Sequence, residues 1–134
     1  MEIIFENQFI LIKRDAKQSL VIDQWKQETV LMTDAQYRAT AEEQVKNLEN
    51  LNPKNWVVNM SQLGFALVPK TQEWADTILF PRILKAGIKK IAFIISPDIF
   101  AQISVEQLMD EKNVKTAEFE IHYFDTESEA LAWF

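Results

Sequence analysis

The sequence predicts an α/β fold with a mixed, mostly parallel sheet and about four helices. Short β-type segments open the chain, and segments of helical periodicity then alternate with apolar strands. The helical segments are long enough to be crossovers between parallel strands. With 134 residues, 48% of them hydrophobic, residues 1–134 fit one domain that can bury a full core.

The first quarter of the chain has the pattern of β-strands. Glu2–Glu6 is short and apolar, Phe9–Arg14 continues in an extended style, and Ser19–Gln27 alternates between two faces. The alternation puts Asp23 on the same side as Trp25. Because short polar loops separate these segments, they predict an N-terminal β-hairpin or meander.

The clearest helix follows this meander. Thr33 and Gln36 have the spacing of a capping box, which marks a helix start. Apolar residues then recur at helical spacing, at Tyr37, Ala41, Val45, Leu48 and Leu51. Pro53 ends the helix, and Asn55–Met60 is a short apolar strand.

A second helix is predicted over Thr71–Ala86. Pro81 lies inside it, so we expect a kink or a break there, since proline removes a hydrogen-bond donor and clashes with the preceding turn. Gly87 has the position of a C-terminal capping glycine. Lys89–Ser96 follows as the most buried strand, because its centre is apolar on both faces, as in central parallel strands.

The last part of the chain predicts two helices and a strand. A helix is predicted to start with Ser96 as its N-cap and Pro97 as its first residue. Ser104 and Gln107 have the spacing of a second capping box, so a restart of the helix is expected there. Ala117–Phe124 alternates as a strand, and Thr126 begins a terminal helix through the last tryptophan.

Composition closes off several functions. The chain has no Cys, one His and two Gly, so zinc sites, thiol catalysis and glycine-rich phosphate loops lack their residues; we expect no metal and no cofactor. A net charge of −6 disfavours nucleic acid and anionic membrane surfaces as partners. No apolar run suggests membrane insertion, and acids stand where a signal peptide would be basic, so a cytoplasmic protein is expected.

Several stretches together resemble a known family. They are KAGIKKIAFIISPD, SVEQ and TESEALAWF in the second half, DQWKQ near the end of the meander, and Trp74 after the middle strand. Over nearly its whole length the chain is similar to the SpoIIAA-like group of small bacterial proteins in the STAS/SEC14 superfamily, whose STAS members include anti-sigma-factor antagonists. The resemblance implies a STAS-like sheet of four to five strands with helices against it.

The same resemblance bears on two functions. True antagonists carry a phosphorylated serine in an Asp-Ser-Ser-Gly-like motif at the start of the second helix. The matching stretch here, residues 65–71, lacks that motif, and Thr71 is its only hydroxyl. Thr71 is therefore the candidate phosphoacceptor, with a plain helix N-cap as the favoured alternative. The SEC14 relatives bind lipids in an apolar pocket.

Polar residues after the central strands form a candidate ligand site. Asn59 and Ser61 follow one strand, and Ser96 and Asp98 follow the next, at the sheet edge where open α/β proteins bind ligands. Capping of the helix alone is the favoured interpretation of Ser96 and Asp98.

An apolar pocket is a second candidate site. It would lie between the sheet and the helix that Pro81 interrupts, lined by Phe65, Trp74 and Phe80. A binding module of this kind should enclose a cavity of about 300 Å³ or more.

The end of the chain supplies the candidate interface. Trp133 and Phe134 lie where a terminal turn has little to bury them. His122 is interpreted as a solvated strand residue rather than a general base, so no catalytic residue is predicted.

These observations favour a non-catalytic cytoplasmic regulatory or scaffolding domain that acts through protein–protein contacts and forms a homodimer. The alternative is a small-molecule or lipid-binding module, and an enzyme is a distant third.

Overall fold

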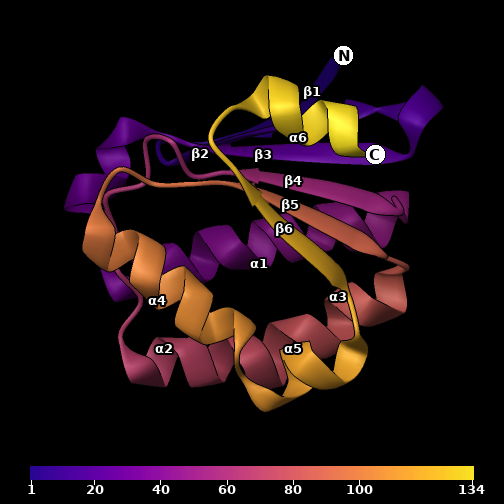
Figure 1. Cartoon of the computed structure of the whole chain (residues 1–134). Coiled ribbons are helices and arrows are strands. Elements are labelled where there is room, and N and C mark those ends of the chain that lie inside the picture. Colours follow the sequence, from indigo (N-terminus) through magenta and orange to yellow (C-terminus); the bar gives the residue numbers. More distant parts are fainter.

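A computed structural model describes all residues, 1–134, and shows a single six-stranded sheet with helices on both of its faces (Figure 1). The strands are β1 (Glu2–Glu6), β2 (Ile10–Asp15), β3 (Leu20–Trp25), β4 (Asn55–Asn59), β5 (Lys90–Ile94) and β6 (Glu120–Phe124). The helices are α1 (Asp34–Leu51), α2 (Pro69–Trp74), the π-helical segment η3 (Ala75–Leu79), α3 (Phe80–Ala86), α4 (Ile99–Met109), α5 (Lys112–Ala117) and α6 (Glu127–Trp133). Two 3₁₀ segments, η1 (Ala16–Gln18) and η2 (Gln27–Leu31), flank β3.

The strand order in the sheet is the same as the order along the chain, β1-β2-β3-β4-β5-β6. The β1–β2 and β2–β3 pairs are antiparallel, whereas β3–β4, β4–β5 and β5–β6 are parallel. The α/β class and the N-terminal meander are confirmed. The predicted count of four to five strands is wrong, because all three meander strands pair. The sheet is mixed, as predicted, but the expectation that it is mostly parallel is met only in part, because two of its five strand pairs are antiparallel.

This strand order decides which face the helices cover. Each parallel crossover moves the chain one strand in the same direction, and crossovers are right-handed, so all crossover helices must lie on one face. The structure has this arrangement: α1, the α2–η3–α3 helix, α4 and α5 cover one face, and α6 alone packs on the other (Figure 1). The fold therefore has one thick helical layer and one thin one.

Two hydrophobic clusters reflect these layers. The larger lies under the crossover helices and has 28 buried residues, among them Val21, Trp25, Leu48, Trp56 and Ile91. The smaller lies under α6 and consists of Leu20, Ile22, Val57, Ala92, Ile94 and Ala130. Alternate residues of β3 and β5 belong to opposite clusters, which explains why β5 is apolar on both faces.

The predicted capping box of α1 is confirmed. The Gln36 backbone N–H donates to Thr33 Oγ1 at 3.2 Å, and the Thr33 N–H donates to Gln36 Oε1 at 2.9 Å. At the other end, Asn52 adopts the left-handed conformation at φ 49°, and Pro53 follows it. Both ends of the helix are thus set by local sequence.

The second helix starts at Pro69, two residues before the predicted start, and is interrupted before Pro81 as expected. The π turn of η3 separates α2 from α3, with Pro81 in the first turn of α3. Proline cannot donate to the carbonyl of Thr77 and its ring would clash with that carbonyl in a regular helix, so the wider turn relieves the conflict. Gly87 ends α3 at φ 105°, a conformation that a side chain would strain.

The start of α4 differs from the prediction by two residues. Asp98, not Ser96, is the N-cap, and its carboxylate accepts from the N–H groups of Phe100 and Ala101 at 3.0 and 3.1 Å. The helix also runs without a restart through Ser104, whose hydroxyl donates to the carbonyl of Ala101 at 2.8 Å. A hydroxyl that bonds within its own helix does not cap a new one.

The strand predicted over Ala117–Phe124 is shorter in the structure. β6 begins at Glu120, and the short helix α5, which the sequence analysis missed, ends at Ala117. Between them Glu118 adopts φ 59° as the C-cap. The terminal helix α6 is confirmed, with Thr126 accepting from the Glu129 N–H at 3.2 Å.

Arg82 joins α3 to α1 through two carboxylates. Its guanidinium nitrogens lie 2.8 Å from Glu42 Oε1 and 2.7 Å from Glu49 Oε1, and these bonds lower the pKa of Glu49. We expect Arg82→Met to lower the free energy of unfolding by about 1 kcal/mol, because two partly exposed ion pairs are lost. Urea denaturation should show this loss shrinking at high salt. The control Lys85→Met, about one turn further along α3, should change the free energy of unfolding little. Equal losses in the two variants would show that the ion pairs of Arg82 with Glu42 and Glu49 do not stabilise the fold.

Candidate functional site

Three segments meet at the carboxyl ends of the parallel strands: η2 after β3, the loop 60–68 after β4, and the loop 95–98 after β5. Buried hydroxyl groups tie these segments together. The Gly64 N–H donates to Thr29 Oγ1 at 3.0 Å, and the Ser96 hydroxyl donates to the carbonyl of Leu63 at 2.7 Å. The Leu67 N–H donates to Ser104 Oγ at 2.9 Å. These bonds give the end of the sheet a fixed frame.

The predicted ligand residues of this region divide into two groups. Ser61 and Asp98 are exposed and line a surface hollow of about 410 Å³, together with Gln27, Val30, Gln62, Leu63, Gly64 and Pro97. Asn59 and Ser96 are buried, and their side-chain polar atoms already form hydrogen bonds within the protein. Asn59 donates to Glu127 Oε2 at 3.1 Å and accepts from the Ser61 N–H at 3.0 Å. Only Ser61 and Asp98 are therefore open to a ligand.

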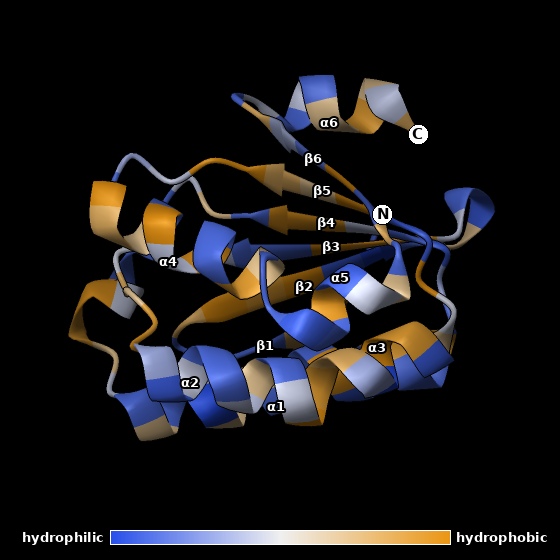
Figure 2. Cartoon of the chain, turned by 60° about the horizontal axis from the view of Figure 1, so that its bottom comes forward, coloured by the Kyte–Doolittle hydropathy of each residue, from blue (hydrophilic) through white to orange (hydrophobic).

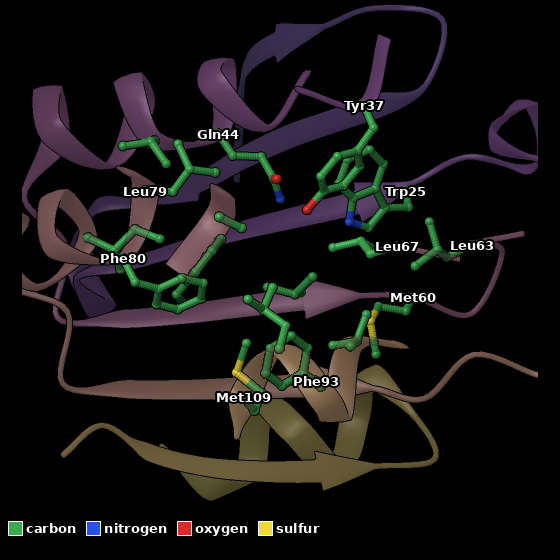
Figure 3. A pocket seen from close by; sticks show the side chains of 17 residues that line it. Trp25, Tyr37, Gln44, Met60, Leu63, Leu67, Leu79, Phe80, Phe93 and Met109 are labelled. Carbon is green, nitrogen blue, oxygen red and sulfur yellow. The ribbon is translucent and has the colours of Figure 1, made fainter. Parts of the chain in front are cut away.

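The predicted apolar lining does not converge on one pocket. Phe65 stacks on Tyr37, with ring centroids 5.2 Å apart, and Trp74 lies under the guanidinium of Arg38 at 4.9 Å. Phe80 alone lines the central cavity (Figure 3).

Thr71 is fully buried. Its hydroxyl donates to the carboxylate of Asp34, and it lies inside the first turn of α2 rather than at the cap. To be phosphorylated, this hydroxyl would first have to become exposed, and the added phosphoryl group would then lie next to the negative carboxylate of Asp34. The folded protein therefore disfavours Thr71 as a phosphoacceptor.

The C-terminal aromatic residues are half-buried. Trp133 and Phe134 pack on the smaller hydrophobic cluster, and the Lys90 ammonium lies 5.0 Å from the centre of the Trp133 ring. The ring of His122 lies tilted against Trp133, with centroids 4.8 Å apart, and stacks on Phe124 at 6.2 Å. These residues form the aromatic seam between β6 and α6.

A cavity lies in the main core between the sheet and the crossover helices (Figure 3). Its volume is about 50 Å³, and 16 of its 17 lining residues are hydrophobic. That volume holds a few water molecules at most and is well below the ~300 Å³ of a drug-sized ligand site. Gln44 is the one polar side chain of its lining, and Figure 3 shows its amide pointing inward.

Gln44 leads to the most unusual group in the molecule, Asp23 on β3. Asp23 is completely buried, and its Oδ2 accepts from Gln44 Nε2 at 2.9 Å and from Trp56 Nε1 at 3.0 Å. Its other oxygen, Oδ1, has no hydrogen-bond partner. Burial raises the pKa of this carboxyl from 3.8 to about 7, although the two hydrogen bonds oppose the rise.

Four of the five most exposed large apolar side chains belong to residues that line the hollow or follow closely after them along the chain. Val30 and Leu31 on η2 are 66% and 78% exposed, and Ile99 and Phe100 at the start of α4 are 65% and 74% exposed. Val30 lines the hollow, as do Pro97 and Asp98, which directly precede Ile99. Figure 2 shows this end of α4 in the hydrophobic colour. We call these four residues the apolar patch.

Two of these features were missed by sequence reasoning. The alternation of β3 already put Asp23 on the side of Trp25, and a carboxylate on a core-facing position is itself a signal. The apolar patch had no such signal, because η2 and the first turn of α4 show apolar residues without a period.

No family model, curated protein or solved structure matches this chain. None of its helices combines the length and apolar character that a membrane span needs.

Proposed function

We propose that the chain is a non-catalytic regulatory or scaffolding domain of the cytoplasm that acts through protein–protein contacts. The observation that carries the proposal is the apolar patch, in which Val30, Leu31, Ile99 and Phe100 are each about two-thirds exposed or more. A cluster of such side chains on a monomer's surface marks an interaction site more often than chance exposure does. The hydroxyl bonds of Thr29 and Ser96 hold its frame in place.

We also propose that the chain is related to the SpoIIAA-like group of the STAS/SEC14 superfamily. An N-terminal meander followed by strand–helix units, with a mixed sheet and helices against it, supports the resemblance. The burial of Thr71 argues for an interaction domain that works without a phosphorylation switch at that residue.

Homodimerisation through the apolar patch is the form of contact that we propose first. Two copies related by a twofold axis would each cover the other's Leu31 and Phe100, so that four large side chains leave water together. The predicted interface residues Trp133 and Phe134 lie on the other face of the sheet and already pack on their own chain, so they contribute less apolar area to a contact.

Sedimentation velocity over a range of protein concentrations tests this dimer. We expect Leu31→Ser combined with Phe100→Ser to weaken dimerisation by about tenfold or more, because central aromatic and aliphatic anchors dominate interfaces. The free energy of unfolding should change by less than about 0.5 kcal/mol, since both side chains are exposed.

Ile78→Ser is the matched control for this experiment. Ile78 is also exposed, but it lies on η3, outside the apolar patch. A wild-type chain that stays monomeric at every concentration would contradict the dimer, as would an equal effect of the control.

A small-molecule or lipid-binding module is the second candidate. The unpaired Oδ1 of Asp23 near the apolar cavity favours it, whereas the volume of about 50 Å³ opposes it unless the core side chains move. Native mass spectrometry of freshly purified protein separates the two candidates. An adduct that is lost on denaturation supports binding of a ligand, and a clean mass with a dimer supports the interaction domain.

A further inference from the structure

The last strand of the sheet, β6, has an open edge. It pairs only with β5, and the order of the sheet places nothing beyond it. Glu120 donates its N–H to the Lys89 carbonyl at 3.0 Å, and the Phe124 carbonyl accepts from Ile95 at 3.0 Å. In a parallel ladder these groups alternate, so the backbone groups of Ile121 and Tyr123 point away from β5 toward the open edge. An added strand would find hydrogen-bonding groups there.

A groove runs beside this edge, on the face that carries the crossover helices. It has a volume of about 370 Å³ and lies between β6 and the residues of α4 and α5. Apolar side chains form much of its surface: Met109, Val114, Phe119, Ile121 and Tyr123. The residues of β6 that line it are those whose backbone groups face the open edge. A strand paired with β6 would therefore direct every second side chain over this groove.

The groove carries a negative rim. Glu106, Asp110 and Glu118 line it, and Lys115 is its one basic residue. Lys115 is already engaged, because its ammonium lies 3.2 Å from Asp110 Oδ1. Glu106 and Asp110 also act on Tyr123, whose pKa is raised to about 12 by burial and by these two charges. The potential in the groove is thus negative.

The charges disfavour a second copy of this chain as the occupant. A second β6 would bring a segment that carries Glu118, Glu120 and Asp125, and no Lys or Arg, to an edge whose groove already has a negative rim. Like charges on neighbouring strands are destabilising, and charged residues on an edge are a common protection against self-pairing. A basic strand meets no such penalty.

We propose that β6 and this groove bind an extended segment of a partner protein in which Lys or Arg alternates with apolar residues. The segment adds a seventh strand, with backbone hydrogen bonds to Ile121 and Tyr123. Its basic side chains lay their aliphatic stems along Met109 and Tyr123 and place their charged ends near Glu106 and Glu118. The alternate apolar residues lie on the other face, beside His122 and Phe124.

This binding surface is separate from the apolar patch, since the two lie at opposite ends of α4. The inference therefore does not depend on the proposed dimer, and either can fail alone. Leu31→Ser with Phe100→Ser, which disrupts the apolar patch, should leave binding at β6 unchanged.

The probe for the test is a synthetic peptide of nine residues that alternates Lys with Val and has blocked ends. We expect saturable NMR shift changes confined to β6, α4 and α5, and slower hydrogen exchange at the amides of Ile121 and Tyr123. A peptide of the same charge, with N-methyl groups on every backbone amide, should not bind, because neither of its edges can donate to the ladder.

Charge variants complete the test. Glu106→Gln with Asp110→Asn should weaken binding of the Lys-Val peptide by about three- to tenfold, as expected for two exposed ion pairs. The pair Glu28→Gln and Glu73→Gln removes the same charge at exposed positions away from the groove and should have less effect. The proposal is overturned if the N-methylated peptide binds equally well, if the control pair weakens binding as much, or if the shifts fall elsewhere. Shift changes at β6 that depend on protein concentration without peptide would identify a second copy as the occupant, which also overturns it.

Discussion

Replacing Asp23 with Asn is expected to remove most of a stability loss that the wild-type protein suffers between pH 4 and pH 8. In the folded state burial raises the pKa of Asp23 to about 7, whereas the unfolded chain titrates near the ordinary 3.8. Between these values the unfolded state has released its proton and the folded state still holds it. The unfolded state binds fewer protons, so the free energy of unfolding falls as the pH rises.

The size of this fall follows from the two pKa values. It amounts to about 4 kcal/mol, absent below pH 4 and complete above pH 7. Asn keeps an oxygen that can accept from Gln44 and Trp56 but has no proton to release. The stability difference between Asp23→Asn and the wild type should therefore grow with pH in favour of the variant.

Urea denaturation at pH 4.5 and pH 8.0 measures this difference. Asp125→Asn is the matched control, since Asp125 is exposed, and it should follow the wild-type curve. A difference between Asp23→Asn and wild type that is the same at both pH values would show that Asp23 does not titrate as its burial requires.

The second large effect is expected at Ala130, where α6 meets the sheet. Ala130 is completely buried in the smaller hydrophobic cluster, against residues of β3, β4 and β5. Ala130→Asp would place a carboxylate among these side chains without a partner, which costs several kcal/mol. We expect the free energy of unfolding to fall by about 3 kcal/mol or more. The fall cannot exceed the free energy with which α6 packs on the sheet, because the helix can detach instead of burying the charge.

Ala132→Asp is the control for this variant. It puts the same charge on the same helix at an exposed position. Hydrogen exchange should show the α6 amides losing protection in Ala130→Asp while those of α1 keep theirs, because α6 covers its face alone. If both variants lost equal stability, helix propensity rather than burial would be responsible.

Local signals predicted much of the fold. The capping box at Thr33 and the N-cap at Thr126 were readable because their hydrogen bonds are made within four residues. The element pattern itself allowed five or six strands, because the first quarter of the chain fitted either a hairpin or a meander, and the count of four to five came from the family resemblance. The start of α4 was misplaced because the Ser96 hydroxyl bonds to the carbonyl of Leu63, a residue 33 positions away. No local pattern reports such a contact.

The candidate sites were harder to predict for the same reason. Ser61 and Asp98 do share a hollow, since the carboxyl ends of parallel strands meet at one edge. Phe65, Trp74 and Phe80 were grouped by type, but their contacts are made by three different neighbours across the fold. Asp23 could have been recognised, because it interrupts the core-facing side of a strand with a charge.

The order of the strands also gives β6 a protective role. β5 is apolar on both faces, and β6 is all that separates its edge from water. β6 itself has exposed Glu120 and His122, so it is a solvated border rather than part of the core. If β6 frayed, the edge of Ile91–Ile94 would be a flat, uncharged template for pairing with another chain. The acidic border strand thus acts as a gatekeeper against aggregation, and its local stability sets how often that template is exposed.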